Sequence, residues 1–230
     1  MIKYTDWGKI GYQEAWDKQE VEFNQHLAKK AIKETYSEPT GRFVICEHPH
    51  VYTLGKSGNS ANMLLNDDLL KKIDATYVKT NRGGDITYHG PGQIVGYPII
   101  DLESLNLQLK EYISKLEDVI IDTIADYGLK GERLDGATGV WLDPANPIKA
   151  RKICAIGVKA SRYVTMHGFA LNVNTNLDYF TYINPCGFVD KGVTSLKKEL
   201  NSEIDINEVK SKIFTNFEKQ FNIKLQPSDI

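Results

Sequence analysis

Apolar residues recur at helical spacing in two long segments of the chain. In segments 12–33 and 106–127, large apolar side chains return every three or four residues, which predicts amphipathic helices that cover a core. We expect the second helix to stop at Gly128, because glycine readily takes the left-handed conformation that ends helices. Segment 205–221 begins with a capping pattern and predicts a last helix. A shorter helix is expected to follow Asn66 and run to residue 73, because the asparagine side chain can cap it.

Runs rich in β-branched and aromatic residues predict the strands. We expect strands at 42–46, 77–80, 93–100, 139–142, 152–158, 164–173 and 223–225. The run 93–100 is strongly apolar and should lie centrally, with an irregularity near Pro98, because proline cannot donate a hydrogen bond to a neighbouring strand. The strands after Gly139 follow one another as in an antiparallel meander. Strands that run together with helices interspersed predict an α+β fold, with a mixed, largely antiparallel sheet flanked by helices.

Composition and charge exclude several classes of protein. A chain of 230 residues with 41% hydrophobic residues can bury a core and still form a pocket, and we expect one domain over 1–230. The formal net charge of −2 and the lack of a basic stripe argue against a nucleic-acid partner. No apolar run approaches the roughly 18 residues of a membrane span. The first residues do not have the pattern of a secretion signal, so we expect a cytoplasmic protein without a membrane partner.

Segment 82–93, RGGDITYHGPGQ, is the most unusual stretch of the sequence. It combines four glycines with a proline, an arginine and a histidine. Glycine permits positive φ and lets another molecule approach without meeting a Cβ atom. Residues 86–88 favour a short strand, so we expect a loop, a strand and a loop, with Arg82 and His89 at the rim of a cleft. A tight hairpin with a capping histidine is the alternative.

The three cysteines have different sequence settings. Their odd number and the lack of a Cys-x-x-Cys pair argue against a disulfide framework or a redox pair. Cys46 and Cys154 lie in apolar runs and are expected to be buried. Cys186 stands between proline and glycine, in a turn, and is the candidate nucleophile. A thiol with an ordinary pKa of about 8.5 needs a cation or a base nearby to form the thiolate, and Lys152 could supply it, although a lone lysine there is also typical of a solvated strand end.

Two histidines could hold a metal ion from one face of a strand. His48 and His50 are two residues apart, which would place both imidazoles on the same side. No further cluster of histidine, cysteine or carboxylate has matching spacing, so we expect no metal.

Four motifs together resemble the lipoyl(octanoyl) transferase family in their order and approximate spacing. They are RGGDITYHGPGQ at 82–93, RKICAIGV at 151–158, HGFALN at 167–172 and INPCG at 183–187. Segment 48–55 also resembles the early part of that family, and the resemblance covers roughly residues 4–225. Cys154 is a small departure, because alanine or serine is expected there, and it affects no catalytic position.

The resemblance implies a fold like the catalytic domain of biotin protein ligases and lipoate ligases, with the acyl group in a tunnel. It implies transfer of an octanoyl or lipoyl group from acyl carrier protein to a specific lysine, without a cofactor. The acceptors would be lipoyl domains of 2-oxoacid dehydrogenase E2 subunits and the glycine-cleavage H protein. By position, Cys186 is implied as the acylated nucleophile and Lys152 as the residue that lowers the pKa of its thiol. The implied acyl-binding walls are Arg82, Gly83, Gly84, Asp85, Ile86, Thr87, Tyr88, His89, Ala155, Ile156, Gly157, Gly168, Phe169 and Ala170.

Two other classes of protein remain open at this point. An ATP-dependent lipoate-protein ligase shares the related fold but needs no acyl-accepting thiol, so Cys186 argues against it. A noncatalytic acyl-binding module would keep the pocket and tolerate Cys186→Ser. The residues themselves fit the transferase that the resemblance implies, because small residues open space for an apolar chain and a thiol makes thioester exchange nearly isoenergetic.

Overall fold

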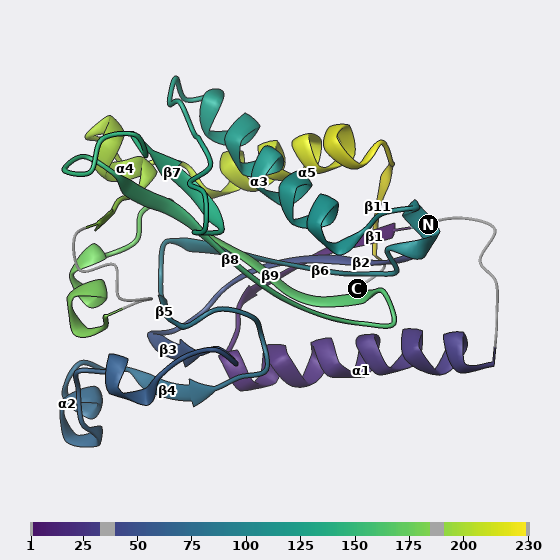
Figure 1. Cartoon of the computed structure of the whole chain (residues 1–230), viewed down its shortest axis with the longest axis horizontal. Helices are drawn as coiled ribbons and strands as arrows, with labels where there is room; N and C mark the ends of the chain where they lie inside the picture. Colours follow the sequence, from purple (N-terminus) through teal and green to yellow (C-terminus); the bar gives the residue numbers. More distant parts are fainter. Residues whose placement is uncertain (1, 33–39, 185–190, 229–230) are drawn as a thin grey trace.

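A mixed sheet forms the centre of the structure, a computed structural model that describes residues 2–32, 40–184 and 191–228. Within these residues the sheet has eight strands, in the order β10-β8-β9-β6-β2-β1-β11 with β7 paired to β8 (Figure 1). The strands are β1 (Ile2–Lys9), β2 (Gly41–Glu47), β6 (Gln93–Ile100), β7 (Gly139–Leu142), β8 (Arg151–Ser161), β9 (Val164–Asn172), β10 (Gly192–Val193) and β11 (Leu225–Pro227). Strands β2, β6, β9, β8 and β7 pair antiparallel. The pairs β1–β2, β1–β11 and β8–β10 are parallel, which confirms the expected mixed sheet.

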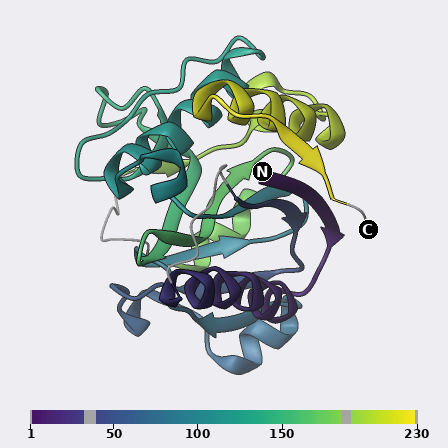
Figure 2. The same ribbon diagram turned by 90° about the vertical axis from the view of Figure 1, so that its right-hand side faces the viewer.

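Helices cover both faces of this sheet (Figures 1 and 2). On one face, α3 (Leu109–Ala125) and α5 (Ile206–Phe221) pack together and bury their apolar positions against the strands in the largest core cluster. On the other face lies α1 (Tyr12–Ala31), whose Phe23 packs in a smaller core cluster with residues of β6 and β9. The shorter helices are α2 (Asp67–Lys72) and α4 (Leu196–Leu200). This is the amphipathic packing that the helical spacing predicts.

A second, three-stranded sheet carries the glycine-rich segment. Strand β3 (Val51–Leu54) pairs parallel with β4 (Thr76–Lys79) and antiparallel with β5 (Ile86–His89). Strand β5 is the predicted short strand within segment 82–93. The loop before it reaches the main sheet, because the Gly83 N–H donates to the Val158 carbonyl oxygen of β8 at 2.9 Å. The two sheets therefore meet where the glycine-rich loop lies over β8.

The sequence predicts most of these elements closely. The three long helices are confirmed, with ends that differ by up to about three residues, and strands 93–100 and 139–142 agree to the residue. Asn66 caps α2 as expected, by accepting the N–H of Leu69 at 3.0 Å. No helix in the described ranges is long and apolar enough to cross a membrane.

Three parts of the chain differ from the expectation. Strand β1 was not predicted, because its sequence IKYTDWGK has several polar and charged residues and gains its place by pairing with β2 and β11. Strand β2 confirms the strand expected at 42–46, but a separate strand β3, which begins at Val51 after Pro49 and lies in the second sheet, was not predicted. Proline has no N–H for a ladder, which favours this break. The last strand lies at 225–227 instead of 223–225.

Candidate active site

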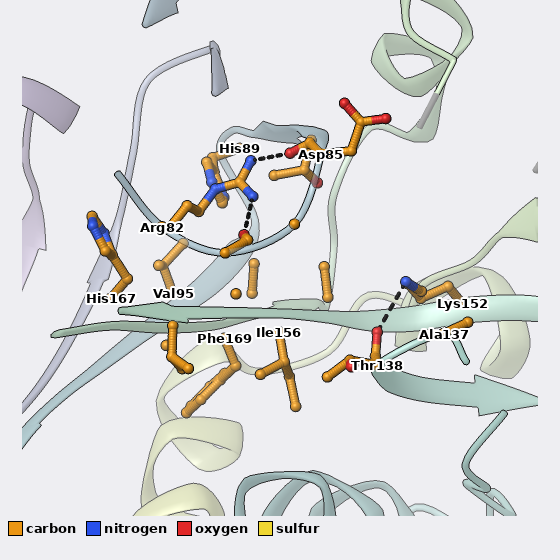
Figure 3. Close-up of a pocket in the computed structure, with 18 of the residues that line it drawn as sticks. Arg82, Asp85, His89, Val95, Ala137, Thr138, Lys152, Ile156, His167 and Phe169 are labelled. Atoms are coloured by element: carbon orange, nitrogen blue, oxygen red, sulfur yellow. Dashed lines mark hydrogen bonds between the residues drawn. The ribbon is translucent and has the colours of Figure 1, made fainter. Parts of the chain in front are cut away.

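The glycine-rich segment and strands β8 and β9 enclose a cavity of about 580 Å³ (Figure 3). This volume is in the usual range for small-molecule sites. Of the residues expected to bind the acyl chain, those that line it are Arg82, Gly83, Gly84, Asp85, Ile86, Thr87, His89, Ala155, Ile156, Gly157, Gly168, Phe169 and Ala170. Tyr88 does not line it, because this side chain alternates to the other face of β5, where it hydrogen-bonds His50 at 2.7 Å.

Small residues form the floor of the cavity. Strands β8 and β9 pair through segments 155–157 and 168–170. The middle residues, Ile156 and Phe169, point to the face covered by α3 and α5, where they pack in the main core (Figure 3). Their neighbours on both strands are all alanine or glycine. Because successive side chains alternate between faces, the opposite face of both strands carries few side-chain atoms, so both the glycine-rich loop and an apolar ligand can lie close to the backbone there.

The glycine-rich loop at 82–85 forms the roof of the cavity, and Arg82 holds this loop in place. Its Nη2 donates to the carbonyl oxygens of Thr53 at 2.6 Å and Asp85 at 2.8 Å, and its Nη1 donates to the Gly83 carbonyl oxygen at 2.9 Å. The guanidinium thus ties the glycine-rich loop to β3. The expected position at the rim is wrong: Arg82 and His89 are only 7% and 6% exposed and belong to the wall.

Two glycines let the glycine-rich loop approach the backbone of β8 closely. A Cβ atom on Gly157 would lie 2.8 Å from the Gly83 carbonyl oxygen, closer than such contacts occur. Gly84 has a φ of +85°, which glycine adopts without steric cost. The glycines are therefore required for close approach of backbone to backbone as well as for the left-handed conformation.

Neutral rings line one part of the cavity wall. Tyr12 stacks on His89, with ring centroids 5.8 Å apart, and Tyr97 also lines the cavity. Burial lowers the pKa of His89 well below its usual range, and burial raises the pKa of Tyr12 to about 12. His89 Nδ1 donates to Gln93 Oε1 at 2.8 Å, so the ring has a fixed orientation. Uncharged rings suit contact with an apolar chain.

His167 lines the same cavity in an unusual backbone conformation. Its φ is +58°, which costs a residue other than glycine on the order of 1–3 kcal/mol. The His167 N–H donates to Gln19 Oε1 of α1 at 2.9 Å, and Nε2 donates to Asn81 Oδ1 at 2.7 Å. Burial lowers the pKa of His167 to about 3, with a further contribution from Arg82. The imidazole is thus neutral and is held by Asn81, while Gln19 holds the backbone of the same residue.

Lys152 lies at the other end of the cavity from His167 (Figure 3). Its Nζ donates to the Thr138 carbonyl oxygen at 3.1 Å and stands 4.7 Å from the centre of the Trp141 ring, a cation–π distance. Trp141 Nε1 in turn donates to the Ala137 carbonyl oxygen at 2.9 Å, which orders the loop before β7. The ammonium group is therefore positioned by a carbonyl and an aromatic face beside the apolar floor.

The candidate nucleophile Cys186 lies outside the described residues. The chain is described up to Asn184 and again from Lys191, and Lys191 lines the cavity. Cys46 and Cys154 are free thiols without exposed surface, as expected, and neither lines the cavity. Burial raises the pKa of both thiols far above the ordinary value, which leaves them unreactive.

Several lining residues were not among the sequence candidates. They include Tyr12, Gln93, Val95, Tyr97, Thr138, Trp141, His167 and Phe180. Gln93 and His167 belong to two of the three motifs that supplied the expected wall residues, so proximity in sequence was an available signal. Tyr12 and Tyr97 carry no such signal, because an aromatic residue on a helix or a central strand is expected in a core regardless of function.

His48 and His50 take part in separate interactions. His48 Nδ1 donates to the Ile10 carbonyl oxygen at 2.8 Å and Nε2 accepts from the Tyr97 hydroxyl at 2.7 Å, whereas the His50 ring stacks on Tyr179. Across the described part of the chain, no three His, Cys, Asp or Glu residues are grouped as metal ligands would be.

Solved structures share this arrangement of sheet and helices. A bipartite lipoate protein ligase of Thermoplasma acidophilum superposes with a TM-score of 0.74 at 13% identity, covering 99% of this chain and 86% of that one. Biotin protein ligase of Aquifex aeolicus superposes with a TM-score of 0.51 at 11% identity, covering 96% and 70%. The fold is therefore that of the lipoate and biotin protein ligase catalytic domains, as the resemblance implied.

Sequence comparison defines the family more narrowly. The model of the lipoyl protein ligase A/B catalytic domain matches residues 12–218. An octanoyltransferase of Bacteroides thetaiotaomicron is 56% identical over 222 residues, which cover 96% of each chain. The chain belongs to the lipoyl protein ligase A/B catalytic domain family, and its similarity to octanoyltransferases makes it an acyltransferase.

Proposed function

We propose that the chain transfers an octanoyl group from acyl carrier protein to a lysine of lipoyl domains, through a thioester on Cys186. The observation that carries this proposal is the floor of small residues made by segments 155–157 and 168–170, with the Lys152 ammonium at one end of the cavity and the His167 imidazole at the other. Such a channel fits an unbranched apolar chain whose reactive end lies beside Lys152. The relatives named octanoyltransferase support the same acyl group.

The first half-reaction loads the enzyme. The Cys186 thiolate attacks the carbonyl carbon of the donor thioester, the bond from that carbon to the carrier sulfur breaks, and the carrier thiolate takes up the proton that Cys186 lost. A thioester is exchanged for a thioester, so the acyl group stays activated. A cation near the sulfur favours the thiolate, and Lys152 is the cavity-lining cation that the motif comparison pairs with Cys186.

The second half-reaction delivers the acyl group to the acceptor. The amine of the acceptor lysine attacks the carbonyl carbon, an amide bond forms, and Cys186 leaves as a thiolate. The attacking amine must lose a proton, for which Lys152 in its neutral form is the proposed acceptor. All bonds are accounted for without a nucleotide, a metal or another cofactor.

The acceptors we propose are lipoyl domains of 2-oxoacid dehydrogenase E2 subunits and the glycine-cleavage H protein. The support is membership in a family of lipoylation enzymes. We further propose that residues 1–230 act as a single catalytic domain in the cytoplasm. Free buried thiols at Cys46 and Cys154 fit a reducing compartment.

An assay of ATP dependence separates transferase from ligase. The purified chain is incubated with octanoyl acyl carrier protein and a lipoyl domain without ATP, and in parallel with octanoate and ATP. We expect the lipoyl domain to gain one octanoyl group in the first mixture only. Octanoylation that requires octanoate and ATP would instead identify a ligase, and acyl binding without transfer in either mixture would identify a binding module.

A further inference from the structure

The bare floor of the cavity ends at His167. Moving along β9 away from Lys152, the floor positions are Ala170 and then Gly168, and the next side chain into the cavity is the His167 imidazole. In a regular strand His167 would share a face with Phe169, because side chains two residues apart point the same way. Phe169 packs in the main core under α3 and α5. The His167 ring instead lies on the α1 side, 6.1 Å from the Trp16 ring.

The left-handed backbone of His167 accounts for this change of face. Strands β6 and β9 stop pairing at Gly96 and Phe169, just before Pro98 of β6, which has no N–H to donate. The His167 N–H turns to Gln19 of α1, and the imidazole is fixed by Asn81. A strained residue held by two side-chain partners, inside a ligand cavity, is a feature that function commonly explains.

The distance along β8 between the Lys152 ammonium and His167 matches the length of an extended eight-carbon acyl chain. Lys152 Nζ donates a hydrogen bond to the Thr138 carbonyl oxygen. The next residue, Gly139, pairs with Ala155 of β8. The ammonium group therefore lies near the level of Ala155 along this strand. His167 pairs with Val158, three residues further along the strand. Three residues of strand span about 10 Å. An extended eight-carbon acyl chain, with carbon–carbon bonds of about 1.5 Å, spans about 9 Å.

We infer that the His167 imidazole is the end wall of the acyl channel and sets the length of the saturated chain that the enzyme loads. This inference rests on the proposed function, because it takes the acyl group to lie on the floor with its reactive end at Lys152. His167 acts on specificity by filling space, and no chemical step passes through it. Longer chains are excluded because their last carbons would have to overlap the ring or fold back.

Substitutions that shorten the side chain at this position test the inference in graded steps. Asparagine tolerates the left-handed conformation and is shorter than histidine by about two heavy atoms. His167→Gly removes the whole side chain and also the backbone strain. Loading is followed by intact mass with octanoyl, decanoyl and dodecanoyl carrier protein in competition. We expect the decanoyl-to-octanoyl ratio to rise on the order of tenfold in His167→Asn, and the dodecanoyl-to-octanoyl ratio to rise similarly only in His167→Gly.

A matched control is available in His48→Asn. His48 is buried like His167 and contacts Tyr97 but does not line the cavity, so its replacement loosens the same region without opening the channel. The ratios should stay at the parent value in this variant. The inference is overturned if folded His167 variants, verified by thermal melts, keep the parent ratios, or if His48→Asn shifts them equally. Failure of the parent protein to load octanoyl at all would instead contradict the proposed function.

Discussion

At the scale of single residues, Lys152 is the described side chain on which the proposed chemistry depends most. The Thr138 carbonyl and the Trp141 ring hold its ammonium at one end of the channel. The carbonyl oxygen and the ring face both attract positive charge, so they suit an ammonium group at this position. This position suits the cation that the proposed mechanism pairs with Cys186.

Replacing Lys152 should separate its two proposed roles. In Lys152→Ala, the pH at which Cys186 alkylates should rise, because the thiolate loses a stabilising cation. In Lys152→Arg, alkylation and loading should recover in large part, but transfer to the lipoyl domain should stay impaired, because arginine keeps the charge and cannot become a neutral base. Single-turnover rates of loading and transfer across pH measure both. If both variants load and transfer at the parent rate, Lys152 is a solvated strand end after all.

Residue identity alone predicted some of the site and missed other parts for clear reasons. The glycines and small residues of the floor were identified because the motifs carry them. The burial of Arg82 could not be predicted, because its bonds to Thr53 come from a strand about 30 residues away. The backbone N–H of His167, in its left-handed conformation, bonds to Gln19, which is far away in the sequence, so no local pattern indicates this arrangement.

At the scale of elements, the glycine-rich loop depends on its contact with β8. Gly84 has a φ of +85° and lies beside the Arg82 guanidinium, whereas Gly83 touches the Val158 carbonyl. The loop therefore keeps its shape through backbone conformation as much as through side chains. A change in either glycine should alter the roof of the cavity.

Alanine at Gly84 should impair loading beyond its cost to folding. Forcing alanine into the left-handed region costs on the order of 1 kcal/mol of stability. Gly128, after α3, provides a matched control: its φ is +77°, and it has open space around it and no place in the cavity wall. We expect Gly84→Ala and Gly128→Ala to lower the melting temperature similarly, and only Gly84→Ala to slow loading. Equal loading rates in the two variants would make the loop a purely structural turn.

Elements with strong periodicity were predicted well, and those set by pairing were not. Helix α3 and strand β6 show their apolar pattern in the sequence, so both elements and their positions could be predicted from it. Strand β1 is stabilised by parallel pairing with strands distant in sequence, and β3 leaves the main sheet after Pro49. Such pairings depend on tertiary contacts, which a local pattern does not contain.

At the scale of the whole molecule, the fold buries several histidines in neutral form. Burial lowers the pKa of His48 to about 4, although its Nδ1 bond to the Ile10 carbonyl opposes this shift. His89 and His167 have lowered pKa values for the same main reason. Each of these residues therefore makes the free energy of unfolding depend on pH.

Acid should destabilise the protein through these histidines. Between pH 6.5 and about 4, unfolded His48 binds a proton that folded His48 does not, so the free energy of unfolding falls as pH falls through this window. The loss from His48 alone is on the order of 3 kcal/mol. Urea unfolding across this window should show a shallower pH dependence in His48→Asn than in the parent. In His50→Asn the slope should change little, because His50 is less buried. Parallel curves for the parent and His48→Asn would contradict the assignment.

The proposed mechanism depends on where the acyl group is held during transfer. The most direct measurement is mass spectrometry of the purified chain after brief incubation with octanoyl acyl carrier protein in the absence of ATP, followed by peptide mapping. The proposed mechanism predicts one added octanoyl group, located on Cys186, sensitive to hydroxylamine and lost in Cys186→Ala. Cys46 and Cys154 should stay unmodified because both are buried away from the cavity. An octanoyl adduct that persists in Cys186→Ala, or that maps to another cysteine, would contradict the mechanism.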